Sequence, residues 1–190
     1  MENVFVYLVG PPGVGKYTVG RLLAESMPAR LIDNHYWNNP IFELLEPDGH
    51  TPLPLAVWDR THAVRTAVLE TIATLAPPQR NFVFTHGVSH DGGHPIDHMI
   101  AGQILSTAER RGANALVVRL RCATAELTQR IENPERAIRL KSRDSGRAEY
   151  YATLAPLDPR HSWTIDLDTT GSTPSETAAL VMQVLSGPGQ

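Results

Sequence analysis

The feature that most constrains the fold of this sequence is a glycine-rich stretch, GPPGVGKYT, which begins at Gly10. It follows a continuous apolar run over residues 4–9, which is typical of a strand buried on both faces of a sheet. From Lys16, apolar residues recur at helical spacing as far as Met27, just before Pro28. A tight glycine turn at a helix N-terminus presents its backbone N–H groups to an anion. The sequence therefore predicts a phosphate-binding loop in a strand-to-helix turn.

This loop fits the usual phosphate-binding pattern except at one position. The pattern is Gly, four residues, Gly, Lys and then Ser or Thr, whose hydroxyl holds magnesium. Tyr17 stands where the hydroxyl residue is expected, and Thr18 comes one place later. A chance glycine turn is the alternative interpretation, which the flanking strand and helix disfavour. The predicted nucleotide-binding residues are Gly10, Pro11, Gly13, Val14, Gly15, Lys16, Tyr17 and Thr18.

Strand-like and helix-like stretches alternate along the sequence. We predict strands at residues 4–9, 29–33, 81–85, 115–121 and 162–167. Helices are predicted at 16–27, 55–76 and 96–108, from 124 onward, and from 174 onward after the capping residue Thr173. This alternation favours a single α/β domain over residues 1–190, in which helices cover both faces of a five-stranded parallel sheet.

Two stretches fit no core element. Residues 34–54 are rich in Pro and Asn, and we expect them to form a lobe over the site. Residues 133–147 contain several cations among few apolar residues, and we expect a mobile flap there. The cations of this stretch are Arg136, Arg139, Lys141, Arg143 and Arg147, with Arg130 nearby.

Composition narrows the class of protein. A formal net charge of −3 supplies no basic surplus, which argues against a nucleic-acid partner. Cys122 is the only cysteine, so an intrachain disulfide is impossible and a reducing compartment fits best. The opening residues carry no cationic segment, and their apolar run is too short for a signal-peptide core or a membrane span. We therefore expect a cytoplasmic protein, not bound to a membrane, that is a monomer or a homodimer.

GPPGVGKYT resembles the loop of nucleoside monophosphate kinases, in which Gly and then Thr follow the lysine. LIDNH, residues 31–35, resembles the end of the second strand in shikimate and gluconate kinases. Three later stretches resemble further parts of these kinases. The fourth strand and its helix resemble VVRLRCATAELTQRI, and the arginine-bearing lid resembles PERAIRLKSRD. The last strand, the adenine-side loop and the final helix resemble IDLDTTGSTPSETAALVMQVL. The resemblance implies a P-loop kinase fold with strand order 2-3-1-4-5, an acceptor lobe at 34–54 and a lid at 133–147.

The same resemblance implies an activity, namely ATP-dependent transfer of a phosphoryl group to a hydroxyl of a small molecule, with Mg²⁺ as the metal. On this precedent Tyr17 replaces a glycine, not a metal ligand, and Thr18 becomes the magnesium candidate. The third strand departs from the family because Thr85 stands where an aspartate often holds magnesium through water. Gly87 lies outside the glycine triplet expected of shikimate kinases, which disfavours shikimate itself as the substrate.

Phosphoryl transfer needs charge neutralisation and a carboxylate that orients the attacking hydroxyl. We predict Lys16, Asp33 and Arg136 as the catalytic residues, with an Asx turn or helix cap as the alternative role of Asp33. Arg139 and Arg143 are further clamp candidates, although a charge run is usually a solvated face. The predicted acceptor contacts are Asp33, His35, Arg60, His86 and Gly87, and Arg65 could also grip an anion.

Four histidines, His86, His90, His94 and His98, recur every fourth residue. Gly92, Gly93 and Pro95 argue against a continuous helix there, so an acceptor-binding loop is favoured over a metal site. Trp58 either lines the acceptor pocket or lies in the core, and we expect the core.

Three alternative functions stay open. A nucleoside or nucleotide kinase could stack a base on His35, Tyr36 or Trp37. A non-catalytic nucleotide-binding module would explain Tyr17 and the absent third-strand aspartate. An RNA or polynucleotide 5′-kinase would need a basic groove, which the net charge does not suggest.

Overall fold

A computed structural model describes residues 1–48, 51, 53–88, 90, 93–138 and 140–187. Its centre is a parallel five-stranded sheet with the order β2-β3-β1-β4-β5, which confirms the predicted fold and strand order. The strands are β1 (Val4–Gly10), β2 (Ala29–Ile32), β3 (Asn81–Gly87), β4 (Asn114–Arg121) and β5 (Thr164–Asp168).

The main helices follow the predicted pattern. They are α1 (Lys16–Ser26), α3 (Ala56–Thr74), α4 (Pro95–Arg110), α5 (Thr124–Glu132) and α8 (Pro174–Ser186). The start of α8 carries the predicted capping box, in which the Thr173 and Glu176 side chains each accept a hydrogen bond from the other residue's backbone N–H. Short helices were not predicted: α2 (His35–Phe42), α6 (Glu135–Ile138), the 3₁₀ turn η1 (Ser145–Arg147) and α7 (Ala148–Thr153).

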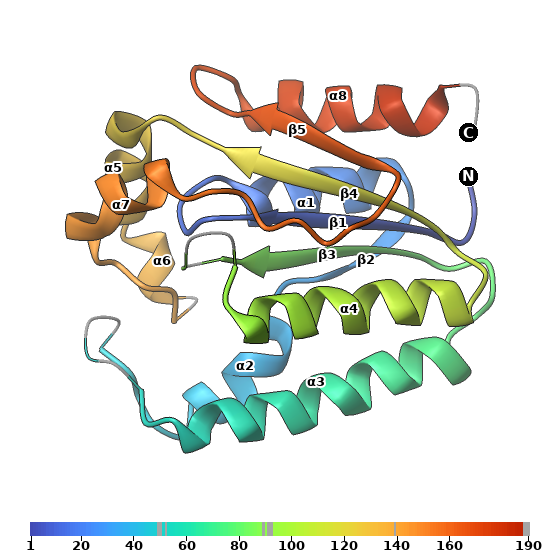
Figure 1. Ribbon diagram of the computed structural model, residues 1–190, viewed down its shortest axis with the longest axis horizontal. Coiled ribbons are helices and arrows are strands. Elements are labelled where there is room, and N and C mark those ends of the chain that lie inside the picture. The colour runs from blue at the N-terminus through green and yellow to red at the C-terminus, as the bar shows by residue number, and fades with distance from the viewer. Residues whose placement is uncertain (49–50, 52, 89, 91–92, 139, 188–190) are drawn as a thin grey trace.

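Strand β1 shows why its apolar run is uninterrupted. Val4, Val6 and Leu8 pack with α1, α5 and α8 on one face of the sheet. The alternate residues Phe5, Tyr7 and Val9 pack with α3 and α4 on the other face. Successive side chains of a strand point to opposite faces, so a strand covered on both sides must be apolar at every position. The two helical layers above and below the sheet are visible in Figure 1.

The two stretches outside the core each contain helix. The acceptor-lobe segment (residues 34–54) begins with α2, whose Trp37 is only 2% exposed. Trp37 is therefore core, and the suggestion that it could stack on a base is wrong. Trp58 was expected in the core but is 42% exposed, with its ring edge-to-face against Phe42. The lid segment (residues 133–147) includes α6 and η1, and Arg139 lies outside the described residues.

All five strands point the same way, so their carboxyl ends share one edge of the sheet. The glycine-rich loop, the start of the acceptor-lobe segment and the lid segment all gather at this edge (Figure 1). Open α/β sheets bind ligands at this edge. Among the described residues, no helix is long and apolar enough to cross a membrane.

Candidate functional site

The glycine-rich loop between β1 and α1 has backbone geometry that larger residues cannot adopt. Gly13 has φ +88°, and a Cβ there would lie 2.8 Å from Cγ1 of Ile131. At Gly10 a Cβ would lie 2.4 Å from the backbone oxygen of Leu120, which cannot move without disturbing β4. At Gly10 and Gly13 the loop is thus pressed against β4 and α5 with no room for a side chain. Its N–H groups lie at the N-terminus of α1, where an anion is favoured.

Arg130 of α5 holds the loop from the side. Its guanidinium donates to the hydroxyl and the backbone oxygen of Thr169 at 2.9 and 3.0 Å. The Thr169 hydroxyl in turn donates to the backbone oxygen of Val14 in the loop. The loop is therefore tied to the end of β5. Sequence reasoning noted Arg130 only as a nearby cation.

Lys16 is buried at the first position of α1, with 8% of its surface exposed. Its ammonium donates to the backbone oxygens of Gly10 and Pro11, both at 2.7 Å. Burial, together with the positive charges of Lys141 and Arg136, lowers the pKa of Lys16 to about 7. A buried lysine crowded by other cations is stabilised when an anion joins them.

Asp33 follows β2 and receives hydrogen bonds from three directions. Its Oδ1 accepts from the backbone N–H of His35 at 2.9 Å. Its Oδ2 accepts from the hydroxyl of Thr85 at 3.1 Å and from the ammonium of Lys141 at 3.0 Å. Burial acts to raise the pKa of this carboxyl, but Lys141 and the hydrogen bond from His35 outweigh it, and the net pKa is lowered. The proposed Asx turn is therefore present, and an ion pair accompanies it.

Thr85 of β3 connects the second and third strands at this point. Its hydroxyl donates to Asp33 and accepts from the backbone N–H of Asn34 at 3.2 Å. The residue that stands in place of the family's aspartate thus supports the Asp33 carboxylate. Because Thr85 is uncharged, it adds no second carboxylate beside Asp33.

The lid segment places two cations near Lys16 and Asp33. Arg136 donates from Nε and Nη2 to the backbone oxygen of Ser142, at 3.0 and 2.8 Å. Its charge reaches Lys16 and His35, since it lowers the pKa of both. Lys141 forms the ion pair with Asp33, a contact that sequence reasoning did not predict. We call the group the phosphate cluster: Lys16, Asp33, Thr85, Arg136 and Lys141.

The two residues after Lys16 take different positions. Tyr17 is half-buried, and the Lys141 ammonium lies 4.7 Å from the centre of its ring. Tyr17 thus faces the lid segment. Thr18, the magnesium candidate, is exposed on the first turn of α1.

His86 belongs to a second polar group, on the opposite face of β3 from Thr85. Its Nδ1 is hydrogen-bonded to the hydroxyl of Tyr7, and its Nε2 lies 3.1 Å from Oδ1 of Asp97. His86 is 4% exposed, and burial lowers the pKa of its ring. We call Tyr7, His86 and Asp97 the histidine cluster. Both ring nitrogens of His86 are engaged here, so an acceptor contact by His86 stays a prediction without structural support.

The remaining predicted contacts differ in burial. His35 is half-buried at the start of α2, with Nδ1 2.9 Å from Oδ1 of Asn39, and burial lowers its pKa to about 4. Gly87 ends β3 beside Gly10 of β1. Arg60 is exposed on α3. Arg65 is buried and donates to Gln103 and His62, so it joins α3 to α4.

The histidines spaced four apart do not lie on one helix. β3 ends at Gly87, and α4 starts at Pro95 with His94 as its cap. Asp97 connects several of them, because its Oδ2 accepts from the His94 N–H and lies 3.8 Å from Nδ1 of His90. Over the part of the chain that the structure describes, no group of three or more His, Cys, Asp or Glu side chains is arranged to hold a metal ion.

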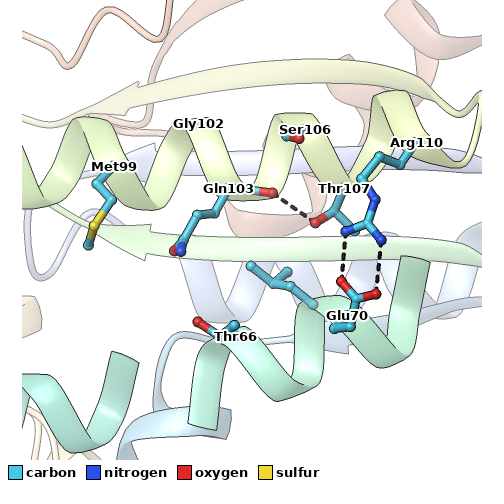
Figure 2. A pocket seen from close by; sticks show the side chains of 9 residues that line it. Thr66, Glu70, Met99, Gly102, Gln103, Ser106, Thr107 and Arg110 are labelled. Atoms are coloured by element: carbon cyan, nitrogen blue, oxygen red, sulfur yellow. Dashed lines mark hydrogen bonds and ion pairs between the residues drawn. The ribbon is translucent and has the colours of Figure 1, made fainter. Parts of the chain in front are cut away.

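A separate groove of about 380 Å³ lies between α3 and α4 (Figure 2). Arg110 spans one end of it, with two hydrogen bonds to Glu70 at 2.7 and 2.9 Å. None of its lining residues belongs to the glycine-rich loop or to the phosphate cluster. The charged side chains of the groove, Arg110 and Glu70, pair with each other and lie away from the glycine-rich loop, so we place the candidate site at the carboxyl edge of the sheet.

Comparisons with known proteins agree on the fold. No family model matches the sequence. A shikimate kinase 2 from Enterobacter sp. is 28% identical over 100 residues, which covers 44% of this chain and 53% of that relative. The chain thus spans about half the length of the curated relatives it matches.

Solved structures match along nearly the whole chain. A putative kinase from Chloroflexus aurantiacus has a TM-score of 0.67 at 15% identity and full coverage of both chains. A gluconokinase from Sinorhizobium meliloti has a TM-score of 0.64 at 17% identity, covering 97% of this chain and 92% of its own. The chain therefore has the fold of the P-loop small-molecule kinases, as the sequence predicted.

Proposed function

We propose that this protein transfers the γ-phosphoryl group of ATP to a hydroxyl of a small molecule. The observation that carries the proposal is the phosphate cluster. A lysine at the end of the loop, a carboxylate at the end of β2 and two lid cations meet at one point of the sheet edge. Phosphoryl transfer needs mainly positioning and electrostatic stabilisation from the protein, and this group of charges is suited to both.

The loop and Lys16 would hold the nucleotide. Backbone N–H groups at the start of α1 suit the phosphate oxygens, and Lys16 would exchange the carbonyl oxygens of Gly10 and Pro11 for the outer phosphates. Mg²⁺ commonly takes its ligands from phosphates, waters and one or two protein groups. The Thr18 hydroxyl, exposed beside the loop, fits such a site, and the ion would neutralise phosphate charge there.

Asp33 would orient the acceptor. Its lowered pKa keeps it ionised at neutral pH, so it can accept a hydrogen bond from an attacking hydroxyl. As the new bond forms between the acceptor oxygen and the γ-phosphorus, the bond to the β,γ-bridging oxygen breaks and ADP leaves. The hydroxyl proton passes to Asp33. Arg136 would stabilise charge on the transferring group, because a guanidinium matches phosphoryl oxygens.

The acceptor class is the open part of the proposal. The similarity to a shikimate kinase and a gluconokinase supports a hydroxyl-bearing sugar acid or a related polyol. A nucleoside acceptor has less support, because of the three predicted stacking residues Trp37 is buried, His35 is half-buried and only Tyr36 is exposed.

A transfer assay tests this proposal. ADP release would be followed with MgATP and a panel of sugars, sugar acids, nucleosides and antibiotics, for the wild type and for Asp33→Asn. We expect at least one acceptor to stimulate ADP release in the wild type and not in the variant. ATP binding with neither transfer nor hydrolysis would favour a non-catalytic nucleotide-binding module, for which the missing third-strand aspartate is the motivating observation.

A further inference from the structure

Lys141 connects two residues that are far apart in the sequence. Its ammonium lies 3.0 Å from Oδ2 of Asp33 and 4.7 Å from the ring centre of Tyr17. Both charged side chains are shielded from water, with 14% of Lys141 and 11% of Asp33 exposed. An ammonium over an aromatic face is attracted to it, most strongly where water is excluded. The tyrosine that interrupts the loop pattern thus forms a platform for a lid cation.

The Lys141 contact makes Asp33 a poor proton acceptor. A neighbouring ammonium favours the ionised carboxylate, and the pKa of Asp33 is lowered accordingly. The other two donors, the His35 N–H and the Thr85 hydroxyl, belong to α2 and β3 and are fixed by them. Lys141 reaches the site from the lid segment by a long flexible side chain. It is the donor that can leave.

The charges around Lys141 favour movement of its ammonium away from Asp33 when an anion binds. Lys141 and Arg136 both lower the pKa of Lys16, which shows that each of these two cations repels Lys16. Asp33 alone does not balance them. A polyphosphate would add several negative charges at the loop, within reach of an ammonium that already lies above Tyr17. The ammonium then has two competing partners, the carboxylate and the phosphates.

We propose that Lys141 is a latch that pairs with Asp33 in the free protein and moves to the outer phosphates when nucleotide binds, with the Tyr17 ring supporting it in both positions. This inference rests on the proposed function. Asp33 becomes an effective proton acceptor only when the phosphoryl donor is present. The acceptor site is thereby coupled to the nucleotide site through one side chain.

A double-mutant cycle on MgATP affinity tests the latch without an identified acceptor. Calorimetry would compare the wild type, Asp33→Asn, Lys141→Met and the double variant. We expect Lys141→Met to weaken MgATP binding about tenfold, since a charge-assisted contact is lost. We expect Asp33→Asn to tighten binding about fivefold, because the exchange no longer breaks an ion pair.

The coupling between the two substitutions is the decisive result. Removing the negative charge of Asp33 reduces its repulsion of the phosphates, and this part of the tightening of MgATP binding does not depend on Lys141. The latch adds a second part that needs the lysine, so tightening should be clearly smaller in the Lys141→Met background. Equal effects in both backgrounds would overturn the latch. Arg147→Met is the matched control, because this lid cation lies over Tyr150 and Tyr151 instead, and we expect less than a twofold change.

Further variants test the role of the Tyr17 ring and replace any variant that does not fold. Tyr17→Leu removes the aromatic platform and should weaken MgATP binding by less than Lys141→Met does. Thermal melts check folding, and Asp33→Ser and Lys141→Gln serve if a first variant is unfolded. If wild type binds no MgATP, or if Lys16→Ala binds it normally, the proposed function fails. If Lys16 matters but the cycle is additive, only the latch fails.

Discussion

Two buried polar groups begin at adjacent residues of β3 and differ in how their charges are balanced. Thr85 points toward the phosphate cluster, and His86 points into the histidine cluster on the other face. In the histidine cluster an imidazole lies between a phenol and a carboxylate, so each of the three groups has a hydrogen-bond partner. In the phosphate cluster three cations share one carboxylate. Burial alone therefore does not mark a ligand site, whereas a buried excess of positive charge favours an anion there.

The largest expected effect separates the two carboxylates. Asp33→Asn keeps the shape of the side chain but removes its charge, so we expect the transfer rate to fall about 10²–10⁴-fold with MgATP still bound. The measurement is turnover with an acceptor identified by the panel. Asp97→Asn is the matched change in the histidine cluster and should lower the melting temperature while turnover stays within a few-fold. Equal losses of turnover in both variants would remove the distinction between the clusters.

The next effect concerns stability. His86→Ala removes the hydrogen-bond partner of the Tyr7 hydroxyl and of Oδ1 of Asp97, whose Oδ2 still accepts from the His94 N–H, and we expect the free energy of unfolding to drop by about 1–3 kcal/mol. Denaturant titration measures this drop, and calorimetry should find MgATP affinity little changed. A variant of normal stability with impaired transfer would instead support the sequence-based prediction that His86 touches the acceptor.

A smaller effect is the pH dependence of proton uptake on MgATP binding, which tests the crowding of positive charge around Lys16. The pKa of Lys16 is about 7 in the free protein, and bound phosphate should raise it again. MgATP binding at pH 8 should therefore take up close to one proton, and at pH 6 almost none. Calorimetry in two buffers of different ionisation enthalpy measures the uptake, and Lys16→Met should abolish it.

The same pKa fixes the sign of the effect on stability. Between pH 7 and the ordinary lysine value of 10.5, the unfolded chain binds the Lys16 proton and the folded protein does not. Stability of the free protein should therefore rise with pH across this window on account of Lys16. If MgATP binding took up the same number of protons at every pH from 6 to 8, the lowered pKa of Lys16 would be contradicted.

The smallest expected effect is at Tyr17. Tyr17→Phe keeps the aromatic face below Lys141 and removes only the hydroxyl, so we expect MgATP affinity and turnover to change by less than about twofold. Steady-state kinetics checks this. A clear loss of turnover would show that the hydroxyl acts in the site, and that the aromatic face is not the part of Tyr17 that matters.

Much of the fold could be predicted from sequence because local signals agreed with one another. The apolar run of β1, the glycine-rich turn and the capping box at Thr173 each specify structure within a few residues. Strand order was different, since it came from a family resemblance. Helix α2 was missed because it carries Pro40 and two asparagines, residues that are poor helix formers, and is stabilised by burial of Trp37 and Phe42.

The site could be predicted only where it is local. Lys16 and its loop are defined by spacing, and Asp33 by its position after an apolar strand. The contact between Lys141 and Asp33 joins residues 108 positions apart, and nothing in the lid's run of cations distinguishes Lys141 from its neighbours. Thr85 and His86 are successive residues of β3, so their side chains point to opposite faces of the sheet. The sequence does not tell which of the two faces the site, because that depends on how the sheet packs.

The most direct test of the central claim is where MgATP binds. Backbone amide shifts of isotope-labelled protein would be recorded by NMR during a titration with MgATP. We predict the largest shifts at residues 10–18, with further shifts around Asp33 and Lys141, and little change in the α3–α4 groove between Glu70 and Arg110 (Figure 2). Shifts confined to that groove, or no shifts at millimolar MgATP, would contradict the assignment of the phosphate cluster as a nucleotide site.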